Sequence, residues 1–271
     1  DYTSNVVTPR TPGEVYTDNL RISPPLWYTQ TLPLFSGRLN PTDTHWLSIT
    51  IAPFKLLTSP PLLWSATVYA LSLGWLVVLA ETIAHLFQSV NGYGFSPIQT
   101  GLLYISPLLG TILGSVVGGK VSDILARTRA YANNGVYEPE SRLLMMIPAV
   151  TATTMGLAGY GWSIQAHTHW IIPTVCFGSI YFGCILGSTS AVTYVLDCHK
   201  KDAIGTQVIL SLGKNIHGLT FSLFVVDWVK ACGPRNTFLI IAGIHLAFLL
   251  ATALMYVYGR TLRVRMGKRA L

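Results

Sequence analysis

The run PLLWSATVYALSLGWLVVLAETIAHLF, residues 61–87, is almost wholly apolar, and Glu81 is the only residue in it that carries a formal charge. A bilayer core of about 30 Å needs about 20 apolar residues in a helix that rises about 1.5 Å per residue. The run exceeds that length. It therefore predicts a helix that crosses a membrane.

Five further runs of this kind follow, at residues 98–119, 143–163, 170–195, 204–229 and 237–259. A soluble protein of this size could bury one or two such helices, but not six. None of the runs shows the alternation of barrel strands, and only helices and closed barrels satisfy every backbone group in lipid. We therefore predict an all-α membrane protein with six transmembrane helices.

The composition of the 271-residue chain points the same way. Charged residues make up 11% of it and apolar residues 51%, whereas about a quarter of a soluble domain is charged. The net charge is +7, but the positive residues lie between the apolar runs rather than on one stripe, so we expect no nucleic-acid partner. The chain begins at Asp1 without an initiating methionine, and we expect a fragment or a processed chain.

The distribution of Lys and Arg predicts the orientation. Fifteen of these eighteen residues flank the predicted helices on one side: four before the first helix, four between the second and third, two between the fourth and fifth, and five after the sixth. The positive-inside rule places that side, and both termini, in the cytoplasm. We expect an integral protein of the plasma membrane or the vacuolar membrane.

The predicted organisation has three parts. Residues 1–60 form a cytoplasmic linker, residues 61–259 the six-helix bundle, and residues 260–271 a basic cytoplasmic tail. Within the linker, residues 25–60 mix Trp, Tyr, Leu and Phe with prolines, which is typical of a segment at a membrane interface. A plain loop explains the same residues equally well.

Polar residues line one face of two predicted helices at the spacing of an α-helix. The fifth helix carries Gln207, Ser211, Lys214, Asn215, Gly218 and Ser222. The fourth carries Cys176, Ser179, Gly183, Ser190, Thr193 and Asp197. A lysine inside a membrane is costly unless it faces protein or water, so we favour the walls of a hydrated cavity. The alternative is hydrogen bonding between helices of a static bundle, with Lys214 reaching the membrane surface.

Two further features lie in the first and second predicted helices. Gly110, Gly114 and Gly118 form a seam of small residues, which predicts close packing against a neighbouring helix. Glu81 is a candidate site for a cation or a proton, and a hydrated helix end is the alternative reading.

The sequence lacks the side-chain sets that membrane enzymes need. Its histidines are not clustered as iron ligands would be, and nothing in the sequence brings Ser190 and His217 together as nucleophile and base. It has no phosphate-binding Gly-Lys-Ser/Thr loop. We predict that the chain is not an enzyme and expect no cofactor and no metal.

The segment Gly119-Lys-Val-Ser-Asp123, followed by Arg127-Thr-Arg129, resembles the Gly-x-x-x-Asp…Arg loop signature of the major facilitator superfamily. The stretch Asn134-Gly-Val-Tyr-Glu-Pro-Glu-Ser-Arg-Leu143 looks like the loop of fungal members of its drug/proton and polyamine-like branches. Thr193-Tyr-Val-Leu-Asp197 and the pair of Gly233 with Asn236-Thr-Phe continue the resemblance in order.

The resemblance implies twelve helices in two six-helix halves, with this chain matching the C-terminal half and the N-terminal half as its missing partner. It implies a secondary transporter that moves a small solute by alternating access, with protons as one candidate coupling ion. Asp123, Arg127 and Arg129 would then act in gating, through contacts between the halves that form and break. Alone, the chain should insert into a membrane without transporting, unless two copies assemble.

The polar faces and two aromatic walls supply the candidate solute-binding residues, namely Tyr69, Tyr104, Ser179, Ser190, Ser211, Lys214 and Asn215. Lys214 favours an anionic or zwitterionic solute. The competing function is a non-transporting receptor or scaffold bundle. That reading needs a ligand-binding loop outside the membrane, and the predicted exterior loops are short.

Overall fold

The computed structural model describes residues 51, 53–89, 92–199 and 202–269, all of them in the compact unit Trp46–Leu271. Of the linker predicted for residues 1–60, residues 1–50 and 52 lie outside the described residues. The described residues form helices and turns without a strand. The α-helices are α4 (Pro60–Phe87), α5 (Pro97–Leu102), α6 (Ile105–Val116), α7 (Ser122–Ala132), α8 (Met146–Gln165), α9 (Ile171–Cys198), α10 (Ala203–Ser222) and α11 (Val225–Arg269).

Three short helical segments connect or extend these helices. They are the 3₁₀ turns η1 (Leu56–Thr58) and η3 (Pro139–Met145) and the π turn η2 (Val117–Val121). The π turn joins α6 to α7, so the second predicted helix does not close at Gly118 and Gly119 as a glycine pair suggests. It runs on to Ala132.

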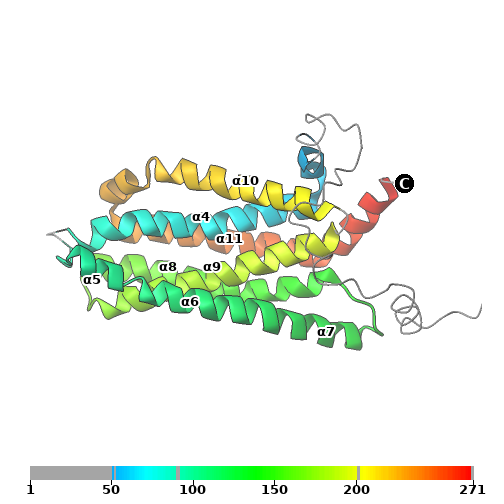
Figure 1. Ribbon diagram of the computed structural model, residues 1–271, viewed down its shortest axis with the longest axis horizontal. Helices are drawn as coiled ribbons and strands as arrows, with labels where there is room; N and C mark the ends of the chain where they lie inside the picture. The colour runs from blue at the N-terminus through cyan, green and yellow to red at the C-terminus, as the bar shows by residue number, and fades with distance from the viewer. Residues whose placement is uncertain (1–50, 52, 90–91, 200–201, 270–271) are drawn as a thin grey trace, which may run out of the picture. The chain divides into compact units, whose positions relative to one another are not determined.

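The long helices run side by side, with α9 packed against α8, α6 and α4, and α10 packed chiefly against α4 (Figure 1). The largest core cluster joins side chains of α4, α8, α9 and α11, among them Trp75, Tyr160, Phe177 and Phe238. We call the end of the bundle where α4 begins and α9 ends the Arg142 end. The opposite end, with the turn after α4, is the Tyr93 end.

Five of the described helical segments are long and apolar enough to cross a membrane: Pro60–Phe87, Pro97–Ala132, Pro139–Gln165, Ile171–Cys198 and Val225–Gly259. The predicted all-α membrane fold is confirmed. The one predicted crossing that is not among the five is the fifth, which corresponds to α10. Its polar stripe lowers its hydropathy, although its 20 residues suffice in length.

The boundaries of the last two predicted helices are wrong. The fifth ends at Ser222 rather than at residue 229, and Val225 already begins α11. The loop expected at residues 230–236 is helical except at Gly233, whose φ of 76° and ψ of 154° break the helix. Glycine adopts a positive φ without strain, and Pro234 then fits the first turn of the helix that follows.

The helix starts follow local chemistry. Ser96 forms a capping box, since its Oγ accepts from the Gln99 N–H and the Gln99 side chain accepts from the Ser96 N–H. Ser59 does not cap α4 with its side chain; its Oγ bonds His199 Nε2 at 3.0 Å, which ties the start of α4 to the end of α9.

The three internal prolines predicted inside membrane helices all fall in a first turn. Pro107, Pro148 and Pro173 are each the third residue of α6, α8 and α9, respectively. Backbone N–H groups in the first turn have no partner within the helix, so a proline there removes no hydrogen bond. The bundle therefore tolerates these prolines without kinked helices.

The glycine seam of α6 packs directly on α9. A Cβ built on Gly110 would overlap the carbonyl oxygen of Gly178, and one on Gly114 would lie 2.8 Å from the carbonyl oxygen of Phe182. Near the crossing, Ser106 Oγ donates to the carbonyl oxygen of Thr174 at 2.7 Å. The two backbones approach this closely because neither residue at the crossing has a side chain, which supports the packing reading of the seam.

Replacing Gly110 with leucine should separate α6 from α9 and lower the free energy of unfolding by at least about 3 kcal/mol, because overpacking against backbone cannot relax through a side chain. Chemical denaturation in mixed micelles measures the loss. Gly101→Ala is the matched control, since nothing lies within 4 Å of a Cβ built there. Equal stability of the two variants would contradict this packing.

Candidate functional site

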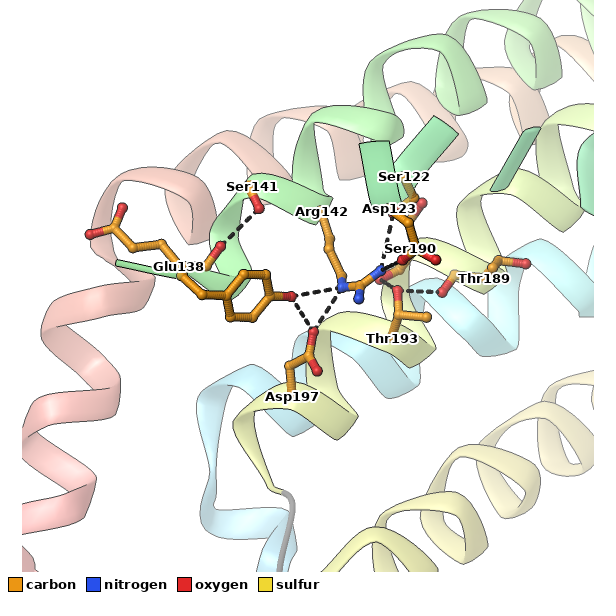
Figure 2. A network of polar contacts seen from close by, with 10 residues as sticks. Ser122, Asp123, Glu138, Ser141, Arg142, Thr189, Ser190, Thr193 and Asp197 are labelled. Atoms are coloured by element: carbon orange, nitrogen blue, oxygen red, sulfur yellow. Dashed lines mark hydrogen bonds and ion pairs between the residues drawn. The ribbon is translucent and has the colours of Figure 1, made fainter. Parts of the chain in front are cut away.

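A polar network at the Arg142 end joins three stretches of the chain around one guanidinium (Figure 2). Arg142 Nε donates to Asp197 Oδ2 at 2.7 Å and to the Tyr137 hydroxyl at 2.9 Å. Its Nη1 donates to Asp123 Oδ1 at 3.1 Å and to Ser122 Oγ at 3.3 Å. One side chain thus binds two carboxylates on different helices.

Each member of the network is placed by a local feature of the fold. Asp123 lies in the first turn of α7, directly after the π turn, and Asp197 lies in the last turn of α9. The chain reverses between α7 and η3 through Asn134 and Gly135, both with positive φ. Asn and Gly tolerate this backbone conformation best, and the reversal brings Tyr137 back toward α9.

Tyr137 completes the network as a donor. Its hydroxyl donates to Asp197 Oδ2 at 2.5 Å while accepting from Arg142. Burial, and then the hydrogen bond to Asp197, raise the pKa of Tyr137 to about 12 against the opposing effect of Arg142. The phenol therefore stays protonated at neutral pH and bridges the ion pair.

The network links η3 and α9 to the continuous helical segment of α6, η2 and α7, which we call the α6–α7 arm, at one end of the bundle. The side chains of Arg142 and Asp197 are 16% and 22% exposed, whereas that of Asp123 is 57% exposed. An ion pair with little exposure is worth more than one in open water, and breaking it leaves an unpaired charge behind. The ion pairs of Arg142 can therefore hold the α6–α7 arm against α9 when they form and release it when they break.

The sequence found this network in part. Of the three predicted gating residues, Asp123 is a member. Arg127 and Arg129 are exposed and make no ion pair with any described residue. Arg129 lines a cavity of about 430 Å³ that Glu138 also borders. Arg142 belongs to the segment 134–143, and Asp197 ends the segment 193–197; both segments carry the family resemblance. Neither segment indicated that the two side chains meet.

The second polar site is a groove between α4 and α10, which lie side by side (Figure 1). It encloses about 490 Å³ and is lined by Leu73, Val77, Lys214, Asn215, Gly218, Leu219 and Ser222. Four of these belong to the predicted stripe of the fifth helix. The structure therefore opens that stripe to a groove rather than burying it between helices.

The rotation of α10 is fixed by one close contact. The His217 ring occupies the space that a Cβ on Gly74 would need, and it meets the Trp75 ring edge-on with 4.9 Å between centroids. This buries the face of α10 that carries Thr206, Ile209 and Leu210. The polar stripe lies on one flank of that face, and exposed apolar residues lie on the other, namely Val208, Leu212, Ile216, Leu219 and Leu223.

Glu81 lies next to Ser222, the residue that lines the groove at its Tyr93 end. It is half-buried on α4, and Ser222 Oγ donates to its Oε1 at 2.5 Å. The predicted ion or proton residue and the last residue of the predicted stripe are thus in direct contact across the two helices.

The stripe predicted on the fourth helix packs against a neighbouring helix instead. Ser179 Oγ donates to the carbonyl oxygen of Ala152 on α8 at 3.2 Å. Ser190 is fully buried and donates to the carbonyl oxygen of Leu186 on its own helix at 2.9 Å. A Cβ on Gly183 would overlap Thr153 Oγ1. The static-bundle reading therefore describes these residues, and Ser179 and Ser190 do not line the groove.

The remaining candidates lie on or near the open faces. Tyr69 is half-buried against the cluster of Leu62, Val195, Ile209 and Leu210. Tyr104 is 37% exposed and its hydroxyl donates to the carbonyl oxygen of Ala80 at 3.4 Å. Ser211 is half-buried on α10, one turn before Lys214 and Asn215. None of the three lines the cavity: Tyr69 lies on α4, Tyr104 at the start of α6 and Ser211 on α10.

Residues 22–212 match the family model described as Major Facilitator Superfamily. The chain is 29% identical to MFS-type transporter oryF of Aspergillus oryzae, over 79% of this chain and 45% of that protein. It is 30% identical to Efflux pump radE of Floropilus chiversii, over 81% and 41%, and 27% identical to Dityrosine transporter 1 of Saccharomyces cerevisiae, over 66% and 31%. The chain spans less than half the length of these relatives. No solved structure matches it.

Replacing Arg142 with alanine should lower the free energy of unfolding by about 3 kcal/mol, the cost of leaving a largely buried carboxylate unpaired. The double variant Arg142→Ala with Asp197→Ala should lose less than Arg142→Ala alone, because it removes the stranded charge. Chemical denaturation in mixed micelles tests both. Arg127→Ala, which breaks no contact, should stay within about 0.5 kcal/mol. A double variant that loses more than the single one would contradict the network.

Proposed function

The chain belongs to the Major Facilitator Superfamily, and from this premise we propose that it forms one half of a secondary transporter that carries a small solute across a membrane by alternating access. Members of the family carry small solutes across membranes, and the matched relatives bear transporter and pump names, in agreement with the prediction that the chain is not an enzyme. Those relatives are more than twice the length of the aligned region.

The α4–α10 groove carries this proposal. A half-buried lysine and an exposed asparagine of α10 line an open groove against α4, which is long and apolar enough to cross a membrane. Because an intramembrane lysine is costly in hydrocarbon, this flank of α10 must face water, solute or protein. A path for solute between two halves supplies that environment, and Tyr69, Tyr104 and Ser211 would border the same path.

The Arg142 network is the proposed gate. With the Lys- and Arg-rich side in the cytoplasm, the Arg142 end faces the cytoplasm and the Tyr93 end faces outward. When Asp123 and Asp197 share Arg142, the α6–α7 arm is held against α9. Releasing it would let the arm move, which biases one of two conformers as alternating access requires. Arg127 and Arg129, exposed beside the gate, are proposed contacts of the N-terminal half.

Three further proposals concern the coupling ion, the membrane location and the partner of the chain. Protons are the proposed coupling ion, with Glu81 as their site in the groove, because it is a half-buried carboxylate in a predicted crossing helix. The proposed location is the plasma or vacuolar membrane, with both termini in the cytoplasm. The N-terminal half is the proposed partner that completes the solute site.

Transport tests the proposal directly. Membrane vesicles that hold the chain together with its N-terminal half should accumulate at least one of tetraethylammonium, toluenesulfonate and 8-aminooctanoate against its gradient when a pH gradient is applied. Lys214→Ala should abolish accumulation at normal membrane insertion, and vesicles with the chain alone should not accumulate any of them. Lys230→Ala, outside the groove, is the control.

The receptor reading predicts a different result. Saturable binding of a solute by the two halves together, without accumulation under any gradient, would overturn the transporter proposal in favour of a non-transporting bundle. If accumulation is unchanged in Lys214→Ala, the groove is not the path of the transported solute.

A further inference from the structure

We infer that the α4–α10 groove binds an elongated zwitterion, with its anionic group at Lys214 and Asn215, its ammonium at Glu81, and an apolar body between them. The inference rests on the proposed function, because it takes the groove to be the solute site. It adds the class of solute and the direction in which the solute lies.

The anionic group of the ligand would meet the Lys214 end. Lys214 is half-buried and pairs with no acid among the residues that the structure describes. Asn215 follows it in the same groove wall and is exposed. A cation that is partly withdrawn from water and lacks a counter-charge gains most from a bound anion, and the neighbouring amide adds a hydrogen-bond donor.

The ammonium of the ligand would meet the Glu81 end. Glu81 accepts one hydrogen bond, from Ser222, and no Lys, Arg or His lies within ion-pair distance of it in the described part of the chain. Its second oxygen keeps its acceptor capacity. The half-buried carboxylate of Glu81 therefore resembles Lys214 in one respect: neither charge has a counter-charge among the described residues.

The two charges are held apart by the helices. Lys214 and Ser222, which marks the Glu81 end, are eight residues apart on α10, or about 12 Å along its axis. Lys214 and Glu81 lie on different helices and do not form an ion pair with each other. A compact amino acid cannot bridge such a separation, whereas a molecule with well-separated charges can.

The middle of the groove requires an apolar body. Leu73 and Val77 of α4 and Leu219 of α10 form its walls. A Cβ built on Gly218 would make an ordinary van der Waals contact with Val77 Cγ2, at 3.8 Å, so the two residues face each other across the groove. The volume of about 490 Å³ lies within the range of small-molecule sites. Apolar walls between two opposite charges fit an alkyl or aromatic spacer.

Calorimetry on the chain together with its N-terminal half in lipid nanodiscs tests this with four probes. These are 8-aminooctanoate, octanoate as the anion alone, octylammonium as the cation alone, and glycine as the short zwitterion. The expected result is that 8-aminooctanoate binds at least tenfold more tightly than each of the other three. Equal affinity for 8-aminooctanoate and octanoate, or no binding of 8-aminooctanoate, would overturn the inference.

Variants assign the two ends. Glu81→Gln should reduce the affinity for 8-aminooctanoate at least tenfold and leave octanoate unchanged, whereas Lys214→Gln should weaken both. The charge swap, Lys214→Glu with Glu81→Lys, should restore the preference for 8-aminooctanoate, since a symmetric spacer can bind in reverse; this also shows that lost binding was not lost folding. Lys230→Gln and Asp227→Asn are matched controls, because each removes a charge of the same sign as Lys214 or Glu81, respectively, at a position outside the groove. Loss of binding in the controls, or no effect of Glu81→Gln, would contradict the assignment.

The two proposals fail in different ways. If 8-aminooctanoate binds with this pattern but is never accumulated by vesicles, the groove is a binding site and the transport proposal falls. If another solute is accumulated independently of Glu81 and Lys214, transport stands and the zwitterion assignment falls.

Discussion

The close approach of backbones around α9 is the constraint on which the rest of the structure depends. Gly110 and Gly178 meet at the crossing of α6 with α9, and Gly183 lets Thr153 of α8 approach from another side. Apolar burial does not drive helices together in lipid as it does in water, so close packing of small residues must do so.

Polar side chains in this bundle fall into two groups that differ in how they are satisfied. Ser and Thr residues within the helices mostly donate to carbonyl oxygens three or four residues earlier, as Ser190, Thr193 and Thr153 do, so they need no solvent. No hydrogen bond of this kind satisfies the side chains of Lys214, Asn215 and Glu81 in the described part of the chain. The first group packs the bundle, and the second lines the groove where we place function.

Much of the fold was predictable from the sequence, because length and hydropathy depend on one helix at a time. The all-α membrane fold and the family are confirmed, and the α6 glycine seam packs closely as expected. Contacts between helices were not predictable in this way. Periodicity shows that Ser179 and Gln207 lie on polar faces, but not that one face meets α8 and the other a groove. Arg142 and Asp197, 55 residues apart, are paired only by the tertiary fold.

The orientation of α10 tests the account most directly. In a background without native cysteines, single cysteines at Gln207, Ser211 and Asn215 should react with a charged, membrane-impermeant thiol reagent in vesicles that hold the chain with its N-terminal half. Cysteines at Val208, Leu212 and Ile216 should react only with a lipophilic one. Equal reaction of both sets with the charged reagent, or protection of the polar set alone, would contradict a water-filled path along this helix.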